Sequence, residues 1–421
     1  MVMVSDVDLL KRYFIRNGDI FSGRWQNFIT NTFMDGHNGI IQIQGNKWRE
    51  QRRFSLHVLR DFGFGRTEME EKIKLEVRAL ITHLNNKFIK KNNKTEAFDV
   101  SKPVADDPSF IQVQQLLDEQ SSLVVKPIMG LYLCLPWTIN LPFVNSAWKK
   151  LLKIRNDFWS FLDKHINEHL IKFNLNNKEI PSSDFIFTYL NEMKRRQKLI
   201  NEQNVYSESY FSEKQLKMLL LDLFFAGSET TVTTTKWGII LLILHPQVQE
   251  LCYNEIINKI GQNEPNLKDR SQLIYLTATI CEIQRIANIL PINLLRTCLE
   301  DIKIDNYVFK EGTMVIPQIS ITLNDSNYFT EPNKFNPERF IEINKFGELT
   351  LKKVEAFLPF SIGKRQCLGE SLARAELFFI FTYLIKNFKF LPESQEKLHS
   401  MKRIYGLTCS PQPFKCRLLA R

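Results

Sequence analysis

One short stretch, residues 360–369, brings together residue types that can do chemistry. It reads Phe-Ser-Ile-Gly-Lys-Arg-Gln-Cys-Leu-Gly and leads into an amphipathic run, Leu368–Phe388, which predicts a helix. A cysteine at the N-terminus of a helix faces unpaired N–H groups and the positive end of the helix dipole, and both favour the thiolate. Arg365 adds a positive charge two residues upstream. We therefore expect Cys367 to be a thiolate.

The glycines of this stretch indicate that something approaches the backbone closely. Gly363 permits backbone angles that other residues avoid, and Gly369 leaves space in which a flat ligand could lie. A single cysteine is more often a small buried apolar residue. This stretch by itself leaves that alternative open.

A second pair of polar side chains lies near the start of the chain. From Trp48 the sequence Trp-Arg-Glu-Gln-Arg-Arg-Phe-Ser-Leu is helical, which places Trp48 and Arg52 on one face. An indole N–H and a guanidinium so placed could hold a carboxylate together. The alternative is a cation–π or packing pair at the surface.

A long helix is predicted from Ser212 to His245. It begins with a Ser-x-x-Gln capping box and continues for about 32 residues, or roughly 48 Å. Its middle, residues 226–231, reads Ala-Gly-Ser-Glu-Thr-Thr, which is unusual for a buried span. This stretch could be a polar face in solvent, but the apolar flanks, 219–225 and 237–244, favour a buried polar notch.

Another group of polar residues is Glu282-Ile-Gln-Arg285, in the predicted helix 277–288. The spacing puts both charges on one face, and the usual meaning is a surface ion pair worth under about 1 kcal/mol. A second arginine, Arg339, follows in the segment Pro-Glu-Arg-Phe, 28 residues before Cys367.

Taken in order, these stretches resemble the cytochrome P-450 family, the haem-thiolate monooxygenases, from about residue 10 to the end. The pattern Phe-x-x-Gly-x-Arg-x-Cys-x-Gly is similar to the family's haem-binding loop, and Ala-Gly-x-Glu-Thr to its signature over the haem. The resemblance implies a single large domain, 1–421, that is mainly α with small β-sheets. It also implies that haem b is the cofactor and that Cys367 is its iron ligand.

The resemblance assigns roles to further residues. Thr230 would hydrogen-bond bound dioxygen, and Glu229 would help to relay protons. Glu282, Arg285 and Arg339 would interlock as a buried charged triad. The residues that would hold the haem are Trp48, Arg52, Arg296 and Arg365, which would anchor the propionates, together with Ala226, Phe360, Gly363 and Gly369.

The implied reaction inserts one oxygen atom from O2 into a lipophilic small molecule. Electrons would come from a separate NADPH-dependent flavoprotein reductase, which Arg53 and Lys364 could dock, because the chain has no flavin or nicotinamide fingerprint. Two rivals are a haem- or ligand-binding protein without turnover and a haem-thiolate isomerase; the Glu229-Thr230 pair favours oxygen activation. The expected apolar pocket walls are 28–40, Phe225, Ala226, 292–295 and Leu407.

Composition sets broader limits. The 421 residues are 44% hydrophobic, which is enough for a large core. The net charge of +10 is scattered, and no nucleic-acid motif accompanies it, so we expect no nucleic-acid partner. The seven cysteines form no Cys-x-x-Cys pair and do not resemble a disulfide framework, which favours a reducing compartment.

Other elements follow from periodicity and turn residues. For residues 1–45 we expect a helix followed by a long loop. In 97–143 we expect short elements, because prolines interrupt this stretch. Strands are expected at 302–309 and 314–316, in one small sheet. Residues 404–419 are similar to the family's last hairpin. Further helices are predicted at 48–66, at 67–94 with a loop from 85, at 146–173 and at 183–198.

Two departures from the family pattern affect stability and location. The N-terminal membrane anchor and first elements are missing from the sequence given, although the resemblance implies the cytoplasmic face of the endoplasmic reticulum membrane. No signal peptide or transmembrane run is visible. Between Asp99 and Asp106 roughly 20 residues of helix are missing on our interpretation. We therefore expect this form to fold poorly and to hold haem weakly.

Overall fold

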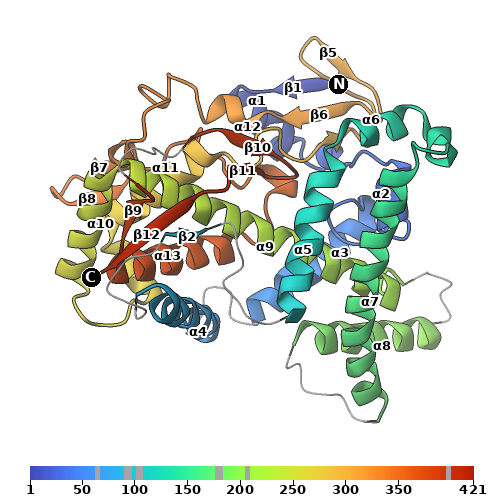
Figure 1. Cartoon of the computed structure of the whole chain (residues 1–421). Coiled ribbons are helices and arrows are strands. Elements are labelled where there is room, and N and C mark those ends of the chain that lie inside the picture. The colour runs from blue at the N-terminus through green and yellow to red at the C-terminus, as the bar shows by residue number, and fades with distance from the viewer. Residues whose placement is uncertain (62–66, 90–96, 101–107, 176–183, 204–208, 395–399) are drawn as a thin grey trace.

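The computed structural model describes the chain except for residues 62–66, 90–96, 101–107, 176–183, 204–208 and 395–399 (Figure 1). Most of the gap predicted near 99–106 lies outside the described residues, as do the end of the helix predicted at 48–66 and part of the loop predicted from residue 85. The prediction of a mainly α fold with small sheets is confirmed.

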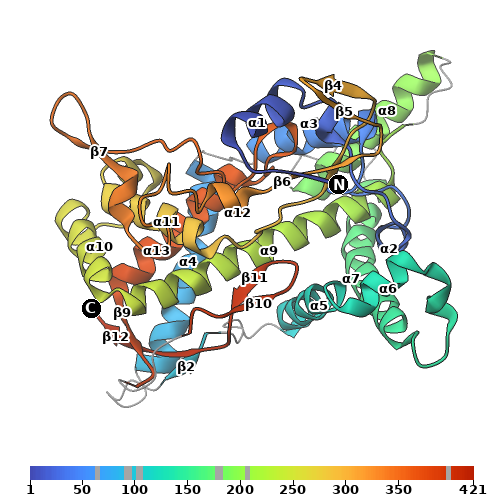
Figure 2. The same ribbon diagram turned by 90° about the horizontal axis from the view of Figure 1, so that it is seen from above.

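Helix α9 (Glu213–Leu244) spans 32 residues and runs across the molecule (Figures 1 and 2). Its N-cap is Ser212, whose side chain accepts the N–H of Gln215, so the predicted helix and its start are confirmed. The predicted capping box is incomplete, because the side-chain oxygen of Gln215 accepts no hydrogen bond from the described residues, while its amide nitrogen donates to the carbonyl of Gly39 at 2.6 Å.

Two groups of helices pack against α9, and both views place them at opposite ends of it. One group packs on its C-terminal half around a large apolar core and consists of α4 (Thr67–Leu84), α10 (Pro246–Lys259), α11 (Ile274–Ala287) and α13 (Glu370–Asn387). The other group packs on its N-terminal half and consists of α2 (Phe28–Phe33), α3 (Gly45–Asp61), α5 (Pro108–Val124), α6 (Pro127–Cys134), α7 (Ser146–Leu175) and α8 (Phe185–Gln203).

Short helical segments complete the set. Two are regular α-helices, α1 (Val7–Lys11) and α12 (Ile319–Thr322). Single turns of 3-10 or π geometry occur at η1 (Arg12–Arg16), η2 (Ile20–Ser22), η3 (Asn85–Ile89), η4 (Pro136–Asn140), η5 (Leu267–Ser271), η6 (Pro337–Phe340) and η7 (Gly363–Arg365).

The strands form small sheets at the periphery. One has the order β1-β6-β3, with β1 (Val2–Val4) parallel to β6 (Met314–Pro317) and β3 (Arg296–Thr297) antiparallel to it. A second has the order β2-β12-β9, formed by Phe98–Asp99, Lys415–Ala420 and Phe388–Pro392. The remaining pairs are the hairpins β4 (Ile302–Ile304) with β5 (Tyr307–Phe309), β7 (Ile341–Ile343) with β8 (Leu349–Leu351), and β10 (Arg403–Tyr405) with β11 (Cys409–Pro411).

Three local predictions are wrong. The first 45 residues hold a strand, β1, because Val2 pairs with Val315, a partner too distant for local patterning to show. The strands expected in one sheet at 302–316 belong to two sheets, since β6 pairs with β1 and β3 rather than with the β4–β5 hairpin. The loop expected from residue 85 begins as a π turn, η3.

Candidate functional site

The cysteine loop, residues 360–369, has a fixed backbone. The Cys367 N–H donates to the carbonyl of Phe360 at 2.9 Å, and the Gln366 N–H donates to that of Gly363 at 3.0 Å. Gly363 has φ +76°, and a Cβ there would lie 1.7 Å from the carbonyl oxygen of Phe14. Only glycine fits this position, both for its backbone angle and for the contact.

The Cys367 side chain is exposed, and its sulfur accepts the N–H of Gly369. Protein atoms nevertheless crowd around the thiol, and this desolvation raises its pKa. The hydrogen bond from Gly369 and the charges of Arg52 and Arg374 act in the opposite direction, while the Glu370 carboxylate adds to the rise. The protein alone therefore does not favour the thiolate.

The expectation that the helix N-terminus and Arg365 make Cys367 a thiolate is therefore corrected. Helix α13 begins at Glu370 with Gly369 as its N-cap, so Cys367 lies before the helix and next to an acidic residue. Arg365 does not contribute, because its guanidinium donates to the backbone carbonyls of Ser22, Ile40 and Ile43. A coordinated metal ion would deprotonate the thiol by its own charge.

Four arginines gather beside the cysteine loop: Arg24, Arg52, Arg296 and Arg365. Burial lowers the pKa of Arg365 to about 7, and the charges of the other three add to this effect. Burial likewise lowers the pKa of Arg24 to about 10 and that of Arg296, with the neighbouring arginines contributing in both cases. None of the four has a carboxylate partner in an ion pair within the described parts of the chain.

The side chains of this arginine cluster are held by backbone carbonyls. Arg24 donates to Ile41, Leu294 and Leu295, and Arg52 donates to Gln366 at 2.7 Å. Arg296 donates to Ser361 and Ile362, while its Nε is buried without a hydrogen-bond partner among the described residues. Carbonyls orient the guanidiniums but do not neutralise them, so the cluster has unmatched positive charge.

Trp48 lies within this cluster. Its ring is buried, with the guanidinium carbon of Arg365 at 3.9 Å and that of Arg52 at 5.9 Å from the ring centroid. The cation–π pairing of Trp48 with Arg52, which the sequence left as the alternative, is thus present, but as part of a buried cluster rather than at the surface.

The middle of α9 is accessible. Ala226 and Gly227 are exposed and Glu229 and Thr230 are half-buried, between apolar segments that are largely buried. A Cβ on Gly227 would meet nothing within 4 Å. The prediction of a buried notch is therefore wrong, because this face of the helix borders open space.

The two polar residues of this stretch have different partners. The Thr230 hydroxyl donates to the carbonyl of Ala226 at 2.8 Å, so its oxygen is left as an acceptor. The Glu229 carboxylate accepts hydroxyls from Ser121 and Thr408. Thr231, next along the helix, donates to Glu376 of α13 at 3.1 Å, which ties α9 to the helix that follows the cysteine loop.

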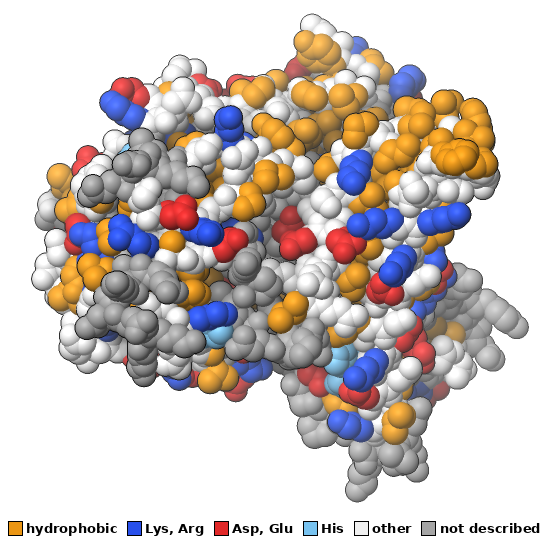
Figure 3. Space-filling model, in the orientation of Figure 1, with side chains coloured by type: hydrophobic (Ala, Val, Ile, Leu, Met, Phe, Trp, Pro, Cys, Tyr) orange, Lys and Arg blue, Asp and Glu red, His pale blue; other side chains and the backbone are white. Residues whose placement is uncertain are grey.

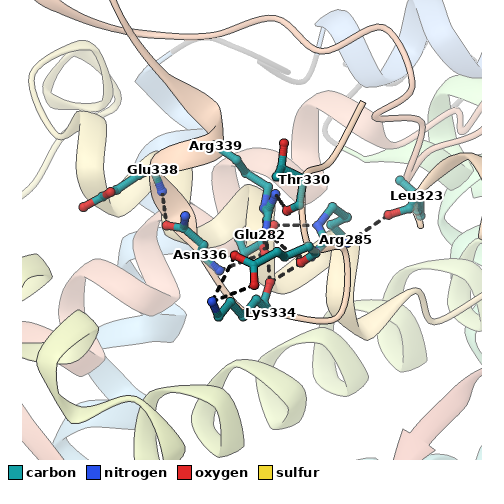
Figure 4. Close-up of polar contacts among 9 residues, drawn as sticks. Glu282, Arg285, Leu323, Thr330, Lys334, Asn336, Glu338 and Arg339 are labelled. Atoms are coloured by element: carbon teal, nitrogen blue, oxygen red, sulfur yellow. Dashed lines mark hydrogen bonds and ion pairs between the residues drawn. The ribbon is translucent and has the colours of Figure 1, made fainter. Parts of the chain in front are cut away.

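Glu282, Arg285 and Arg339 are brought together as one buried group (Figure 4). Arg285 makes two hydrogen bonds to the Glu282 carboxylate, at 2.7 and 2.8 Å, and Arg339 makes one at 3.1 Å. The side chains of Glu282 and Arg285 are fully buried, so the surface pair considered from the sequence is excluded. The arginines also donate to the carbonyls of Leu323 and Lys334, which satisfies the group internally.

The residues present fit a flat group with two carboxylates, such as haem. The arginine cluster supplies positive charge for the carboxylates, and Cys367 supplies an accessible sulfur. A Cβ on Gly369 would meet nothing within 4 Å, so the backbone beside the sulfur is open to a flat ligand. The described residues contain no group of three or more His, Cys, Asp or Glu side chains that could hold a metal ion.

Sequence reasoning missed two buried residues near the site. Arg24 could not be recognised, because its environment comes from carbonyls about 270 residues away. Asp222 carries a weak signal, since it is an isolated acid within an apolar run of α9. It accepts the N–H groups of Ile40 and Ile41 at 2.6 and 2.8 Å. Burial raises the pKa of Asp222 to about 7.

Comparison with known proteins gives one consistent result. The family model described as Cytochrome P450 matches residues 1–418. Cytochrome P450 2H2 of Gallus gallus is 33% identical over 440 residues, covering 100% of this chain and 84% of the relative. Cytochrome P450 2J2 of Homo sapiens is 36% identical over 432 residues, covering 97% of this chain and 80% of the relative. The chain belongs to the cytochrome P450 family and is a haem-dependent monooxygenase.

Proposed function

We propose that Cys367 is the thiolate ligand of the haem iron and that the enzyme oxidises lipophilic small molecules with electrons from an NADPH-dependent flavoprotein reductase. The observation that carries this proposal is the arginine cluster, Arg24, Arg52, Arg296 and Arg365, next to an accessible cysteine. Unmatched buried positive charge is costly, and a ligand with two carboxylates removes that cost.

When bound, a thiolate-ligated haem supplies oxygen activation, because the sulfur donates electron density that favours O–O cleavage. The protein's part is to hold that group and to deliver protons. Arg52 and Arg296 would anchor its carboxylates, with Arg24 and Trp48 behind them. Phe360 is half-buried, and the guanidinium carbon of Arg374 lies 4.8 Å from its ring centroid.

Thr230 and Glu229 would act at the reacting side. The Thr230 oxygen is an acceptor, since its proton is given to the carbonyl of Ala226, and it can take a hydrogen bond from a protonated ligand. Glu229, adjacent on α9, has one carboxylate oxygen without a partner within the described residues, which suits it to accept and release a proton. Ala226, exposed beside them, leaves room for the ligand.

The substrate class rests on the apolar character of the surroundings. Ile292 and Leu407 are large apolar side chains that are exposed. Phe225, which directly precedes Ala226 on α9, is a buried apolar side chain. Apolar side chains around a few polar groups are typical of pockets for lipophilic molecules.

Surface residues support the proposed partners. Arg53 and Lys364 are exposed cations on α3 and the cysteine loop, and they would dock the acidic face of a reductase. A membrane surface would be met by α6 and the segment that follows it to Phe143, where apolar side chains gather in Figure 3 and are exposed at Leu131, Leu135, Trp137, Leu141 and Phe143. No helix in the described part of the chain is long and apolar enough to cross a membrane.

The reduced, carbon monoxide difference spectrum of the purified chain and of C367S and C367H tests the ligand. The wild-type chain should give a Soret band far to the red of that of a histidine-ligated haem. Both variants should lose this band, because neither residue supplies a soft anionic sulfur. A red-shifted band that persists in C367S would show that Cys367 is not the ligand.

A further inference from the structure

Three separate elements meet at the Glu229 carboxylate. Ser121 on α5 donates its hydroxyl to Glu229 Oε1 at 2.9 Å, and Thr408, in the turn between β10 and β11, donates to the same oxygen at 2.7 Å. Ser121 and Thr408 are 6% and 3% exposed. These are buried, charge-assisted hydrogen bonds, which are stronger than bonds between neutral groups.

The direction of each bond is fixed by the chemistry of the groups. An ionised carboxylate only accepts, so both hydroxyl protons are directed at Glu229. The Ser121 oxygen also accepts the N–H of Leu407 at 3.0 Å, which closes a bridge between α5 and the turn. Thr408 lies 3.4 Å from the hydroxyl of Thr233, which can only donate to it, because the proton of Thr408 is already used.

The two oxygens of Glu229 are therefore unequal. Oε1 has both donors, whereas Oε2 is buried and has no hydrogen-bond partner among the described residues. A buried carboxylate oxygen without a donor is uncommon and calls for an explanation, of which a catalytic role is one. The Glu229 charge also acts on Lys236. Burial lowers the pKa of Lys236, whereas the acids Asp118, Asp99 and Glu229 raise it.

We propose that Ser121 and Thr408 are positioning residues for proton delivery. They hold Oε1 of Glu229 so that Oε2 is the end that takes up and releases the proton. The inference rests on the proposed function, because it takes Glu229 as the proton relay. Since α5 and the β10–β11 turn are separate from α9, the relay acid is oriented only when both elements are packed against it.

The test compares the wild-type chain with S121A, T408V and E229Q, using product formed per NADPH consumed and hydrogen peroxide released. Each of S121A and T408V should lower the coupling of electrons to product by about tenfold, the equivalent of one hydrogen bond to a charged group. Both should enlarge the solvent isotope effect on product formation, which a purely structural defect would leave unchanged. T408S should restore coupling, because it keeps the hydroxyl.

S122A is the matched control. Ser122 is the next residue on α5, but it is exposed and its hydroxyl donates to the carbonyl of Glu119. S122A should behave as wild type. In an E229Q background, T408V should cause no further loss of coupling, since its effect acts through Glu229.

A second readout does not depend on turnover. A double-mutant cycle on urea unfolding should give a favourable interaction between Ser121 and Glu229, and none between Ser122 and Glu229. Coupling in S121A and T408V equal to that of S122A, with E229Q uncoupled, would overturn the positioning role alone. Wild-type coupling in E229Q would overturn it together with the relay role of Glu229, and a haem-loaded wild-type chain that lacks the thiolate band would overturn the proposed function itself.

Discussion

Oδ2 of Asp222 accepts the N–H of Ile40 at 2.6 Å, across a separation of 182 positions in the sequence. The same oxygen accepts the N–H of Ile41. Gly39 must precede them, because a Cβ there would lie 2.3 Å from this carboxylate oxygen. Through these contacts α9 fixes the loop that carries the carbonyls of Ile40 and Ile43, to which Arg365 donates.

The first prediction concerns pH. Burial raises the pKa of Asp222 from 3.8 to about 7, so the folded state binds the proton more tightly than the unfolded state. The stabilisation from this proton is complete below about pH 4 and is lost as pH rises through 7, a change of about 4 kcal/mol. D222N should match wild type near pH 4 and be more stable at pH 8, as measured by urea unfolding.

D222A is the control for this experiment. It removes the acceptor of two buried N–H groups and should be less stable than D222N at both pH values, by about 1–3 kcal/mol for each N–H. A wild-type chain whose stability relative to D222N does not change between pH 4 and 8 would contradict the raised pKa.

The second prediction concerns Arg296, which is buried beside Arg24 and Arg52 and has an unpartnered Nε. R296L should raise the stability of the haem-free protein, because it removes an uncompensated buried charge. The same change should weaken haem binding by about tenfold or more, because it removes a charged donor to a carboxylate. Melting of the haem-free chain and haem titration measure the two effects, and R49A, at an exposed ion pair, serves as control.

The third prediction concerns Thr230. T230A should keep its haem spectrum and substrate binding but lose coupling of electrons to product by roughly tenfold to hundredfold, because the proposed role of the hydroxyl is in the reaction and not in the fold. T235A is matched, since Thr235 makes the same hydrogen bond to the carbonyl four residues earlier, at 2.9 Å. Equal coupling in T230A and T235A would remove Thr230 from the mechanism.

The fourth prediction concerns the buried triad. R285A leaves the Glu282 carboxylate buried with one fewer partner and should cost about 3–5 kcal/mol in the free energy of unfolding. K334A breaks an exposed pair with Glu331 in the same region, at 2.8 Å, and should cost under about 1 kcal/mol. Similar losses in the two variants would show that burial does not decide the strength of these contacts.

The last prediction concerns the segment between Asp99 and Asp106. On α9, Phe224 and Val232 are 40% and 41% exposed, although the helix crosses the whole molecule. Inserting a helical segment of about 20 residues should raise haem occupancy and the melting temperature, since unfilled apolar contacts cost several kcal/mol. A Gly/Ser insert of equal length should not. A chain that already purifies fully loaded with haem and melts cooperatively would show that no segment is missing.

The sequence predicted what depends on local spacing. Ser212 and the apolar run after it define α9, and the spacing of Glu282 and Arg285 places both on one helix face. The cysteine loop is recognisable because its glycines and arginine lie within ten residues. Local spacing was misleading where the surroundings reverse a local effect. At Cys367, desolvation raises the pKa of the thiol.

What the sequence did not predict depends on contacts between distant segments. The pairing of Val2 with Val315 and the donation from Arg24 to Leu295 have no local pattern. Ser121 is an ordinary polar residue on its own helix, and only the packed structure places it against Glu229.

The contact between Gly363 and the carbonyl of Phe14 has a consequence for biosynthesis. Phe14 is made about 350 residues before Gly363, and at about 5–20 residues per second the interval is on the order of 20–70 s. During that time the first segment has no final partner and exposes apolar rings such as Phe14 and Phe21, which are fully buried in the finished fold. Apolar surface of this segment therefore remains exposed, and prone to aggregation, until the cysteine loop has been made.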